Sequence, residues 1–97
     1  MKRARFVGQA GDEYLAQTSR YVAEQKELGT RFVAAVEAAT ARALAFPSSG
    51  SPGPAGTRRV VIRGFPFWLV YRPHQDGIMI FAVAHFARAP GYWMGRV

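Results

Sequence analysis

The chain has 97 residues, of which 49% are hydrophobic and 20% charged, and it carries a net charge of +7 and no cysteine. These values suit a single domain, residues 1–97, with one core, and they exclude a disordered chain, disulfides and thiolate metal sites. No apolar run approaches the roughly 20 residues of a membrane helix, and no apolar stretch follows the basic N-terminus as in a signal peptide. We therefore expect a cytoplasmic protein that does not enter a membrane and that uses no metal or other cofactor.

The N-terminal residues predict a short strand and a first helix. Arg3–Val7 alternates in the manner of a strand, Gly8–Gly11 ends it, and Asp12 is suited to cap the helix that follows. Side chains at helical spacing mark the expected buried stripe of this helix: Tyr14, Thr18, Tyr21, Gln25 and Leu28, with Leu15 and Val22 beside them. Gly29 is expected to end the helix as a C-terminal glycine.

A second helix is predicted from Thr30, which can cap it, to the residues before Pro47, which cannot continue it. Its apolar residues repeat at intervals of three and four: Phe32, Val36, Ala39, Ala43 and Phe46. The very short connection predicts an antiparallel pair of helices. The following segment, 48–57, has three Ser, three Gly and two Pro in ten residues, which indicates a flexible surface loop.

The C-terminal half predicts three antiparallel strands. Residues 59–63 alternate, with Val60 and Ile62 on one face, and residues 67–72 are rich in aromatic and β-branched side chains. Residues 73–77 contain an Asp-Gly turn, and 78–86 are almost entirely apolar, as expected for a strand covered on both faces. The whole chain predicts an α+β fold of order β-α-α-β-β-β, with a helical hairpin packed on a mostly antiparallel four-stranded sheet.

Charge is unevenly distributed along the chain. Residues 1–57 have seven Lys or Arg and five Asp or Glu, a net charge of +2, whereas residues 58–97 have six Arg and one Asp, a net charge of +5. A basic, aromatic surface on the sheet half suits phosphate backbones or an acidic protein partner. The alternative is that these arginines are simply solvated.

The element order and several local patterns together resemble the RelE/ParE family of bacterial toxins from type II toxin–antitoxin systems. The residues that carry the resemblance are Gly29-Thr-Arg-Phe32 before an Ala-rich helix, Arg58-Arg59-Val60, Phe65-Pro66-Phe67, Val70-Tyr71-Arg72, and the C-terminal series His85, Arg88, Pro90, Tyr92 and Trp93. The resemblance spans essentially the whole chain. It implies a growth inhibitor that a cognate antitoxin holds inactive.

Two mechanisms occur on this family's fold, and fold alone does not choose between them. RelE-like members cut mRNA on the ribosome, and ParE-like members poison DNA gyrase without nuclease activity. Ribosome-dependent, metal-free mRNA cleavage is the leading interpretation of the sequence, with the ribosome and mRNA as partners. The alternatives are a gyrase poison, with DNA gyrase as the partner, and an RNA-binding module without catalysis.

For the cleavage mechanism, the resemblance implies catalytic roles for His85, Arg88 and Tyr92. His85 would act as general acid or base, Arg88 would contact the phosphate and Tyr92 would match the catalytic tyrosine. Each side chain also has a structural alternative: a hydrogen-bonded histidine, a salt-bridged arginine and a packed tyrosine. The residues predicted to bind nucleic acid are Arg58, Arg59, Arg63, Arg72 and Trp93, of which Trp93 is the best suited to packing.

Two features depart from the nuclease pattern. RelE uses strand lysines, but the only lysines here are Lys2 and Lys26, both outside the three C-terminal strands. Ala87 stands where this branch of the family usually has a further basic residue. Both departures count against nuclease activity and leave the gyrase alternative open.

Overall fold

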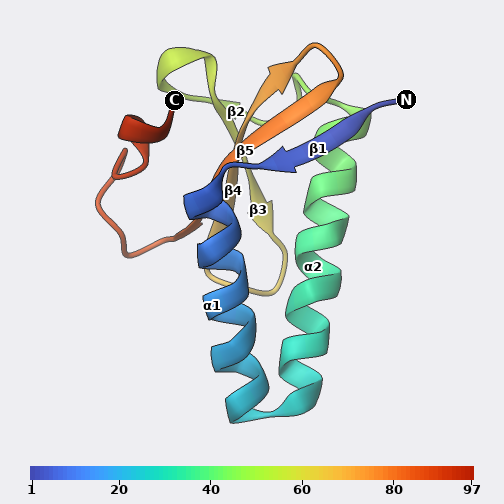
Figure 1. The fold of residues 1–97 in the computed structure, drawn as a ribbon, viewed down its shortest axis with the longest axis vertical. Helices are drawn as coiled ribbons and strands as arrows, with labels where there is room; N and C mark the ends of the chain where they lie inside the picture. The colour runs from blue at the N-terminus through green and yellow to red at the C-terminus, as the bar shows by residue number, and fades with distance from the viewer.

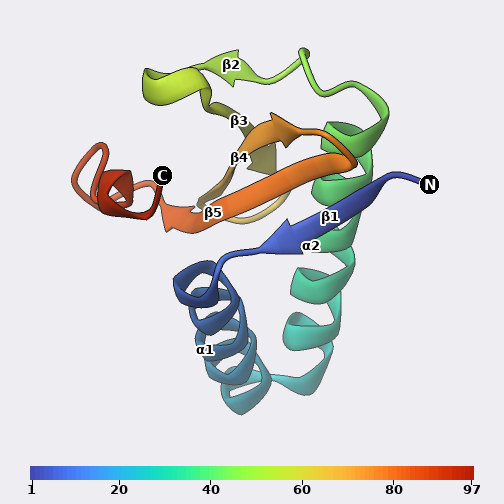
Figure 2. The same ribbon diagram turned by 45° about the horizontal axis from the view of Figure 1, so that its top comes forward.

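The computed structural model describes residues 1–97, which form one α+β layer structure. Figure 1 shows two long helices side by side beneath a twisted sheet, and Figure 2 shows the C-terminal segment beyond the end of the last strand. The elements are β1 (Arg3–Phe6), α1 (Gly8–Glu24), α2 (Lys26–Ala45), β2 (Ser51–Pro52), β3 (Arg58–Ile62), β4 (Phe67–His74) and β5 (Gly77–His85), with short 3-10 helices η1 (Pro54–Gly56) and η2 (Met94–Arg96). Neither α-helix has both the length and the apolar character that crossing a bilayer requires.

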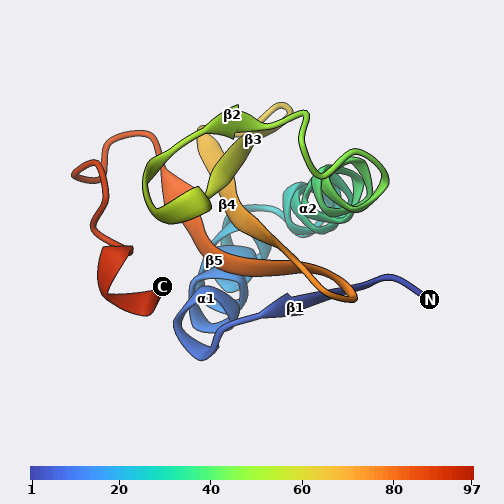
Figure 3. The same cartoon turned by 90° about the horizontal axis from the view of Figure 1, so that it is seen from above.

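The sheet has five strands in the order β1-β5-β4-β3-β2, so the prediction of four strands is wrong by one (Figure 3). β1 runs parallel to β5, and all other neighbours are antiparallel, which confirms the mostly antiparallel arrangement. The extra strand, β2, lies within the segment 48–57 that was predicted as a loop. Composition alone missed it because a two-residue edge strand has no periodicity to detect.

Segment 48–57 is anchored to the sheet by polar contacts. The buried Tyr71 hydroxyl donates to the Pro47 carbonyl oxygen (2.8 Å) and accepts from the Gly50 N–H (3.3 Å), and Arg58 donates to the Gly50 carbonyl (2.8 Å). Burial raises the pKa of the Tyr71 phenol. A Cβ on Gly50 would lie 2.7 Å from the Tyr71 hydroxyl oxygen, so glycine permits this close approach.

The main core lies between the helices and one face of the sheet, and aromatic rings dominate its centre. The fully buried Phe32 ring lies 5.1–6.1 Å from the ring centroids of Tyr14, Tyr21, Phe65 and Phe67. Edge-to-face and tilted pairs of this kind add to the stabilisation that burial provides. The aromatic stripe predicted on the two helices is therefore confirmed at its centre.

The ends of the predicted stripes are not buried. Leu15 is 68% exposed, Val22 47% and Phe46 67%, so the prediction that these three side chains belong to the helical core is wrong. Leu15 and Val22 lie seven positions apart on α1, and Phe46 follows the last residue of α2. Helical spacing alone locates a side chain around the helix only to within about a quarter turn. This precision is too low to distinguish the centre of the buried stripe from its exposed edges.

The helix boundaries also differ from the prediction. α1 begins at Gly8 rather than at an Asp12 cap, and the break between the helices falls at Gln25, whose backbone is extended (φ −163°). Gly29 and Thr30 thus lie inside α2. Gly29 is buried, and a Cβ there would lie 3.1 Å from the Val22 backbone nitrogen, so this glycine serves the close approach of α1 to α2.

A β-bulge in β5 changes which side chains face the helices. Val70 pairs with Ala82 and Tyr71 with Ile80, which leaves Phe81 as the extra residue. As a result Ile80 and Val83 both join the main core, whereas Ala82 joins a second cluster on the opposite face. This second cluster consists of Val70, Ala82, Ala84 and Trp93. It confirms that β5 is covered on both faces, by the helices and by the C-terminal segment.

The start of β5 provides a test of the β1–β5 pairing. Gly77 has φ 144°, and a Cβ there would collide with the backbone of Arg3. We expect Gly77→Ala to lower the free energy of unfolding by about 3 kcal/mol, because backbone strain and overpacking each cost roughly 1–3 kcal/mol. Gly95→Ala is the control, since nothing lies within 4 Å of the added Cβ, and it should change stability by less than about 0.5 kcal/mol. Equal midpoints of urea unfolding for the two variants would contradict the pairing.

Candidate functional site

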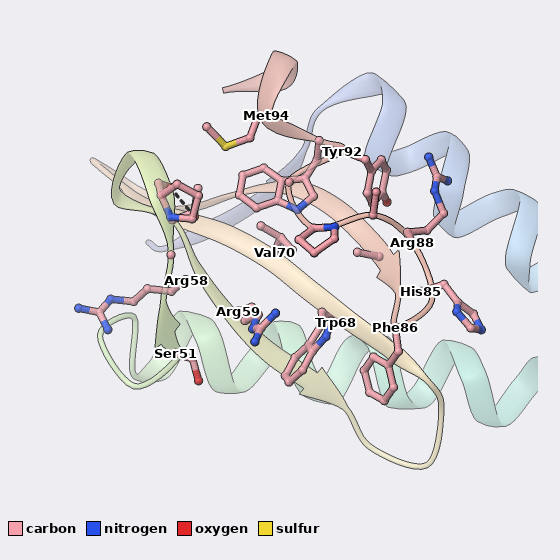
Figure 4. Close-up of a pocket in the computed structure, with 18 of the residues that line it drawn as sticks. Ser51, Arg58, Arg59, Trp68, Val70, His85, Phe86, Arg88, Tyr92 and Met94 are labelled. Carbon is pink, nitrogen blue, oxygen red and sulfur yellow. Dashed lines mark hydrogen bonds between the residues drawn. The ribbon is translucent and has the colours of Figure 1, made fainter.

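A groove of about 590 Å³ lies on the face of the sheet opposite the helices (Figure 4). One wall is the β2–η1 segment and the other is the C-terminal segment, residues 86–97, with Val70, Ala84 and Trp93 between them. Three arginines line it, Arg58, Arg59 and Arg88, and no Asp or Glu does. The groove is therefore a positively charged site with an apolar floor.

Three side chains form a diagonal line across the groove. The Arg59 guanidinium lies 4.1 Å above the centroid of the Trp68 ring, and the Phe86 ring centroid lies 5.1 Å from that of Trp68 on the other side. Strand pairing creates this line, because Trp68 is opposite Ala84 in β5 and Phe86 follows two residues later. A guanidinium over an indole face is a favourable cation–π arrangement, which orients Arg59.

Glu13, in the second turn of α1, holds the C-terminal segment in place. Its carboxylate accepts hydrogen bonds from the Val83 backbone N–H (3.1 Å), the Tyr92 hydroxyl (2.7 Å) and both terminal nitrogens of Arg96 (3.0 Å each). Arg96 also donates to the Phe81 carbonyl oxygen (2.9 Å). The ion pair is largely shielded, with 15% of the Arg96 side chain and 19% of the Glu13 side chain exposed.

Tyr92 is held as a neutral phenol. Burial, followed by its hydrogen bond to the Glu13 carboxylate, raises the pKa of Tyr92 to about 12. Arg88 stacks over the Tyr92 ring at 3.8 Å, and Arg96 lies 5.1 Å from the ring centroid. To accept a proton as a general base, Tyr92 would first have to be deprotonated near the working pH, so its raised pKa favours the structural interpretation of Tyr92 over the catalytic one.

His85 and Arg88 lie at one end of the groove but do not converge with the Tyr92 hydroxyl. The His85 Nδ1 accepts the Ala87 backbone N–H (2.9 Å), and its ring packs against the edge of Phe67 at 5.0 Å. Figure 4 shows the His85 and Arg88 side chains pointing in different directions from the rim. The catalytic roles of His85, Arg88 and Tyr92 stay predictions, which this arrangement does not favour.

The residues predicted to bind nucleic acid fall into two groups. Arg58 and Arg59 line the groove, and Trp93, 8% exposed, packs in its floor, as the packing alternative proposed. Arg72 instead donates to the Ala55 carbonyl (3.2 Å) and stacks over Phe81, and Arg63 lies beyond the end of β3, outside the groove.

Sequence reasoning missed Glu13, Trp68 and Phe86. The signal for Trp68 was its alternation with Val70 on β4, which places both on the face opposite the helices. No local signal marks Glu13, because its partners lie 70 to 83 positions away in the sequence. No group of three or more His, Asp or Glu side chains is placed to hold a metal ion.

Comparison with known proteins decides the family. A family model described as the ParE toxin of the type II toxin–antitoxin system, parDE, matches residues 9–90. The chain belongs to the ParE toxin family. The match covers both helices and strands β2 to β5, and it confirms the RelE/ParE resemblance on its ParE side.

A solved structure supports the same fold. The chain is similar to a chain described as the chromosomal ParDE TA system from P. aeruginosa, with a TM-score of 0.73 and 19% sequence identity. The similarity covers 88% of this chain and 96% of that one. No curated protein sequence matches this ParE-family chain.

The Glu13 contacts predict a measurable coupling. We expect Glu13→Ala to lower the free energy of unfolding by about 2–3 kcal/mol, because four hydrogen bonds to a charged carboxylate are lost and Arg96 is left without its carboxylate partner. A double-mutant cycle with Arg96→Ala should give a coupling energy of about 1–2 kcal/mol by urea denaturation. Additive effects of the two substitutions would show that the ion pair does not hold the segment.

The raised pKa of Tyr92 predicts a pH dependence at the alkaline end. Because the pKa of Tyr92 is about 12 in the folded protein and about 10 in the unfolded chain, the folded state holds the phenol proton more tightly. The resulting stabilisation is complete below about pH 10 and is lost as the pH rises toward 12. A difference ultraviolet titration of wild type against Tyr92→Phe should show one phenol ionising near pH 12. Ionisation of that phenol near pH 10 would contradict the Glu13 contact.

Proposed function

We propose that this ParE-family protein inhibits growth by poisoning DNA gyrase, without catalysing a reaction itself, and that a cognate antitoxin holds it inactive. Membership of the ParE family carries the proposal, because ParE-type toxins act on gyrase and RelE-type toxins on mRNA. The similar P. aeruginosa structure is a toxin–antitoxin system, which supports an antitoxin partner for this chain.

The geometry of the groove supports binding rather than cleavage. Metal-free RNA cleavage needs one group to take the 2′-OH proton and another to protonate the leaving oxygen. The Tyr92 hydroxyl is committed to Glu13, and the pKa of Tyr92 is raised to about 12, so it is poorly suited to either step. The His85 side chain points away from Tyr92 at the rim of the groove, so the two do not face each other (Figure 4).

The charge of the C-terminal half supports an acidic partner segment. Residues 58–97 carry a net charge of +5, and the groove they form has no acidic lining residue. Complementary charge between two proteins raises their association rate and disfavours binding of partners with the same sign of charge. An acidic region of the antitoxin is therefore suited to this side of the toxin.

A pulse of toxin expression, followed in the same cells by plasmid topology and by mapping of mRNA 5′ ends, tests the proposal. We expect gyrase-linked DNA breaks and altered supercoiling while translated messages stay intact. Purified toxin should inhibit supercoiling by purified gyrase. His85→Ala removes the one histidine in the groove, and the concentration of this variant needed for inhibition should lie within about twofold of the wild-type value.

The opposite pattern would restore the cleavage mechanism. New 5′ ends in translated messages, with normal supercoiling and with loss of toxicity in His85→Ala, would overturn the gyrase proposal. The matched control is His74→Ala, since His74 lies at the end of β4 away from the groove. It should leave both readouts unchanged.

A further inference from the structure

We propose that the groove binds single-stranded nucleic acid directly, with a base stacked on the Trp68–Phe86 pair and a phosphate held by Arg59. Poisoning of gyrase does not require this contact, so the inference goes beyond the proposed function. The binding is also measurable without gyrase. Its failure is therefore distinguishable from failure of the gyrase proposal.

The aromatic residues supply the stacking surface. Phe86 is 49% exposed and Trp68 is partly exposed, so both rings are accessible to a ligand. Trp93, which packs on the same face of the sheet, is buried. Aromatic side chains on an open sheet face are the means by which many domains stack successive bases of a single strand. The Arg59 guanidinium lies 4.1 Å from the centroid of the Trp68 ring, so it places a positive charge directly beside the stacking surface.

The charges around this surface select a polyanion. Arg58, Arg59 and Arg88 line the groove without a carboxylate among them. Glu13, which approaches the C-terminal segment from α1, is neutralised by Arg96. Each arginine that contacts a phosphate releases condensed counterions, so the affinity for a strand should depend steeply on salt.

Several backbone groups of the groove are unavailable to a ligand that binds by main-chain hydrogen bonds. The Gly53, Phe86, Arg88, Tyr92 and Met94 N–H groups all donate within the protein. The three prolines of the lining have no N–H to offer. At these positions the groove offers stacking and side-chain charge, which suits bases and phosphates.

The size and shape of the groove argue for a single strand. Its volume of about 590 Å³ lies within the usual range of small-ligand sites, and walls on two sides, β2–η1 and residues 86–97, enclose it. No helix or two-stranded ribbon projects from this face to enter a duplex groove, because both α-helices lie on the other face (Figure 3).

Fluorescence anisotropy with a labelled thymidine strand of about twelve nucleotides tests the proposal. We expect salt-dependent binding that is at least about tenfold tighter than to a duplex of the same length. Trp68→Ala should weaken binding by about tenfold or more, since stacking on one aromatic ring carries roughly that factor, and Trp68→Phe should retain most of the affinity. Circular dichroism of each variant confirms that it is folded.

The role of charge is tested separately. Arg59→Ala should reduce the steepness of log affinity against log salt by about 0.7, the value for one phosphate contact with a single strand. Arg31→Ala is the control, because it removes the same charge from an exposed position on α2, outside the groove. It should leave the salt slope unchanged.

Several results would overturn the proposal. The first is that the wild type binds the thymidine strand no more tightly than Trp68→Ala does. The second is that the duplex binds as tightly as the single strand. The third is that Arg59→Ala and Arg31→Ala lower the salt slope by the same amount. A labelled peptide of about ten glutamates that binds more tightly than the thymidine strand, with the same loss in Trp68→Ala, would assign the groove to an acidic protein segment instead.

Discussion

The unpaired edge of β5 is the constraint on which the C-terminal third of the structure depends. β1 pairs only with Gly77–Ile80, so the last residues of β5 have no strand beside them on that side. Buried backbone groups need partners, and Glu13 takes the Val83 N–H while Arg96 takes the Phe81 carbonyl. Because Arg96 follows β5 in the chain and yet bonds to Phe81 and Glu13, closing this edge makes the segment after His85 fold back beside the sheet. That path seats Trp93 on the second cluster and builds one wall of the groove.

Much of the fold could be predicted because its patterns are local. Alternation in β3, the apolar run of β5 and the spacing of Phe32, Val36, Ala39 and Ala43 each describe one element by itself. The helix boundaries could not be predicted in this way. Gly29 looks like a residue that ends a helix, yet packing against Val22 decides its role inside α2, and this contact exists only once the two helices meet. Similarly, β2 owes its position to the Tyr71 hydroxyl, which is 21 residues away from Gly50 in the sequence.

The candidate site shows the same division between local and distant information. The sequence named a catalytic set and a separate nucleic-acid-binding set, and members of both line one groove: Arg58, Arg59, His85, Arg88, Tyr92 and Trp93. What the sequence could not supply was the environment of Tyr92. A carboxylate 79 positions earlier determines its protonation, and strand register determines that Trp68 and Phe86 meet. Residue type and spacing thus named only some of the side chains that gather, since Arg63 and Arg72 lie outside the groove, and tertiary contacts determine what each can do.

The Glu13 contacts also connect the stability of this protein to its mechanism. A phenol that donates to a carboxylate at 2.7 Å gains stability from keeping its proton, and the same contact removes the proton acceptor that a nuclease needs. Arg96 fills the remaining carboxylate sites, so the contact is satisfied without a substrate. Apart from His85, this face presents mainly arginines and aromatic rings, which bind well but do not transfer protons. On a family fold that hosts both cleavage and poisoning, these contacts favour a toxin that acts by binding.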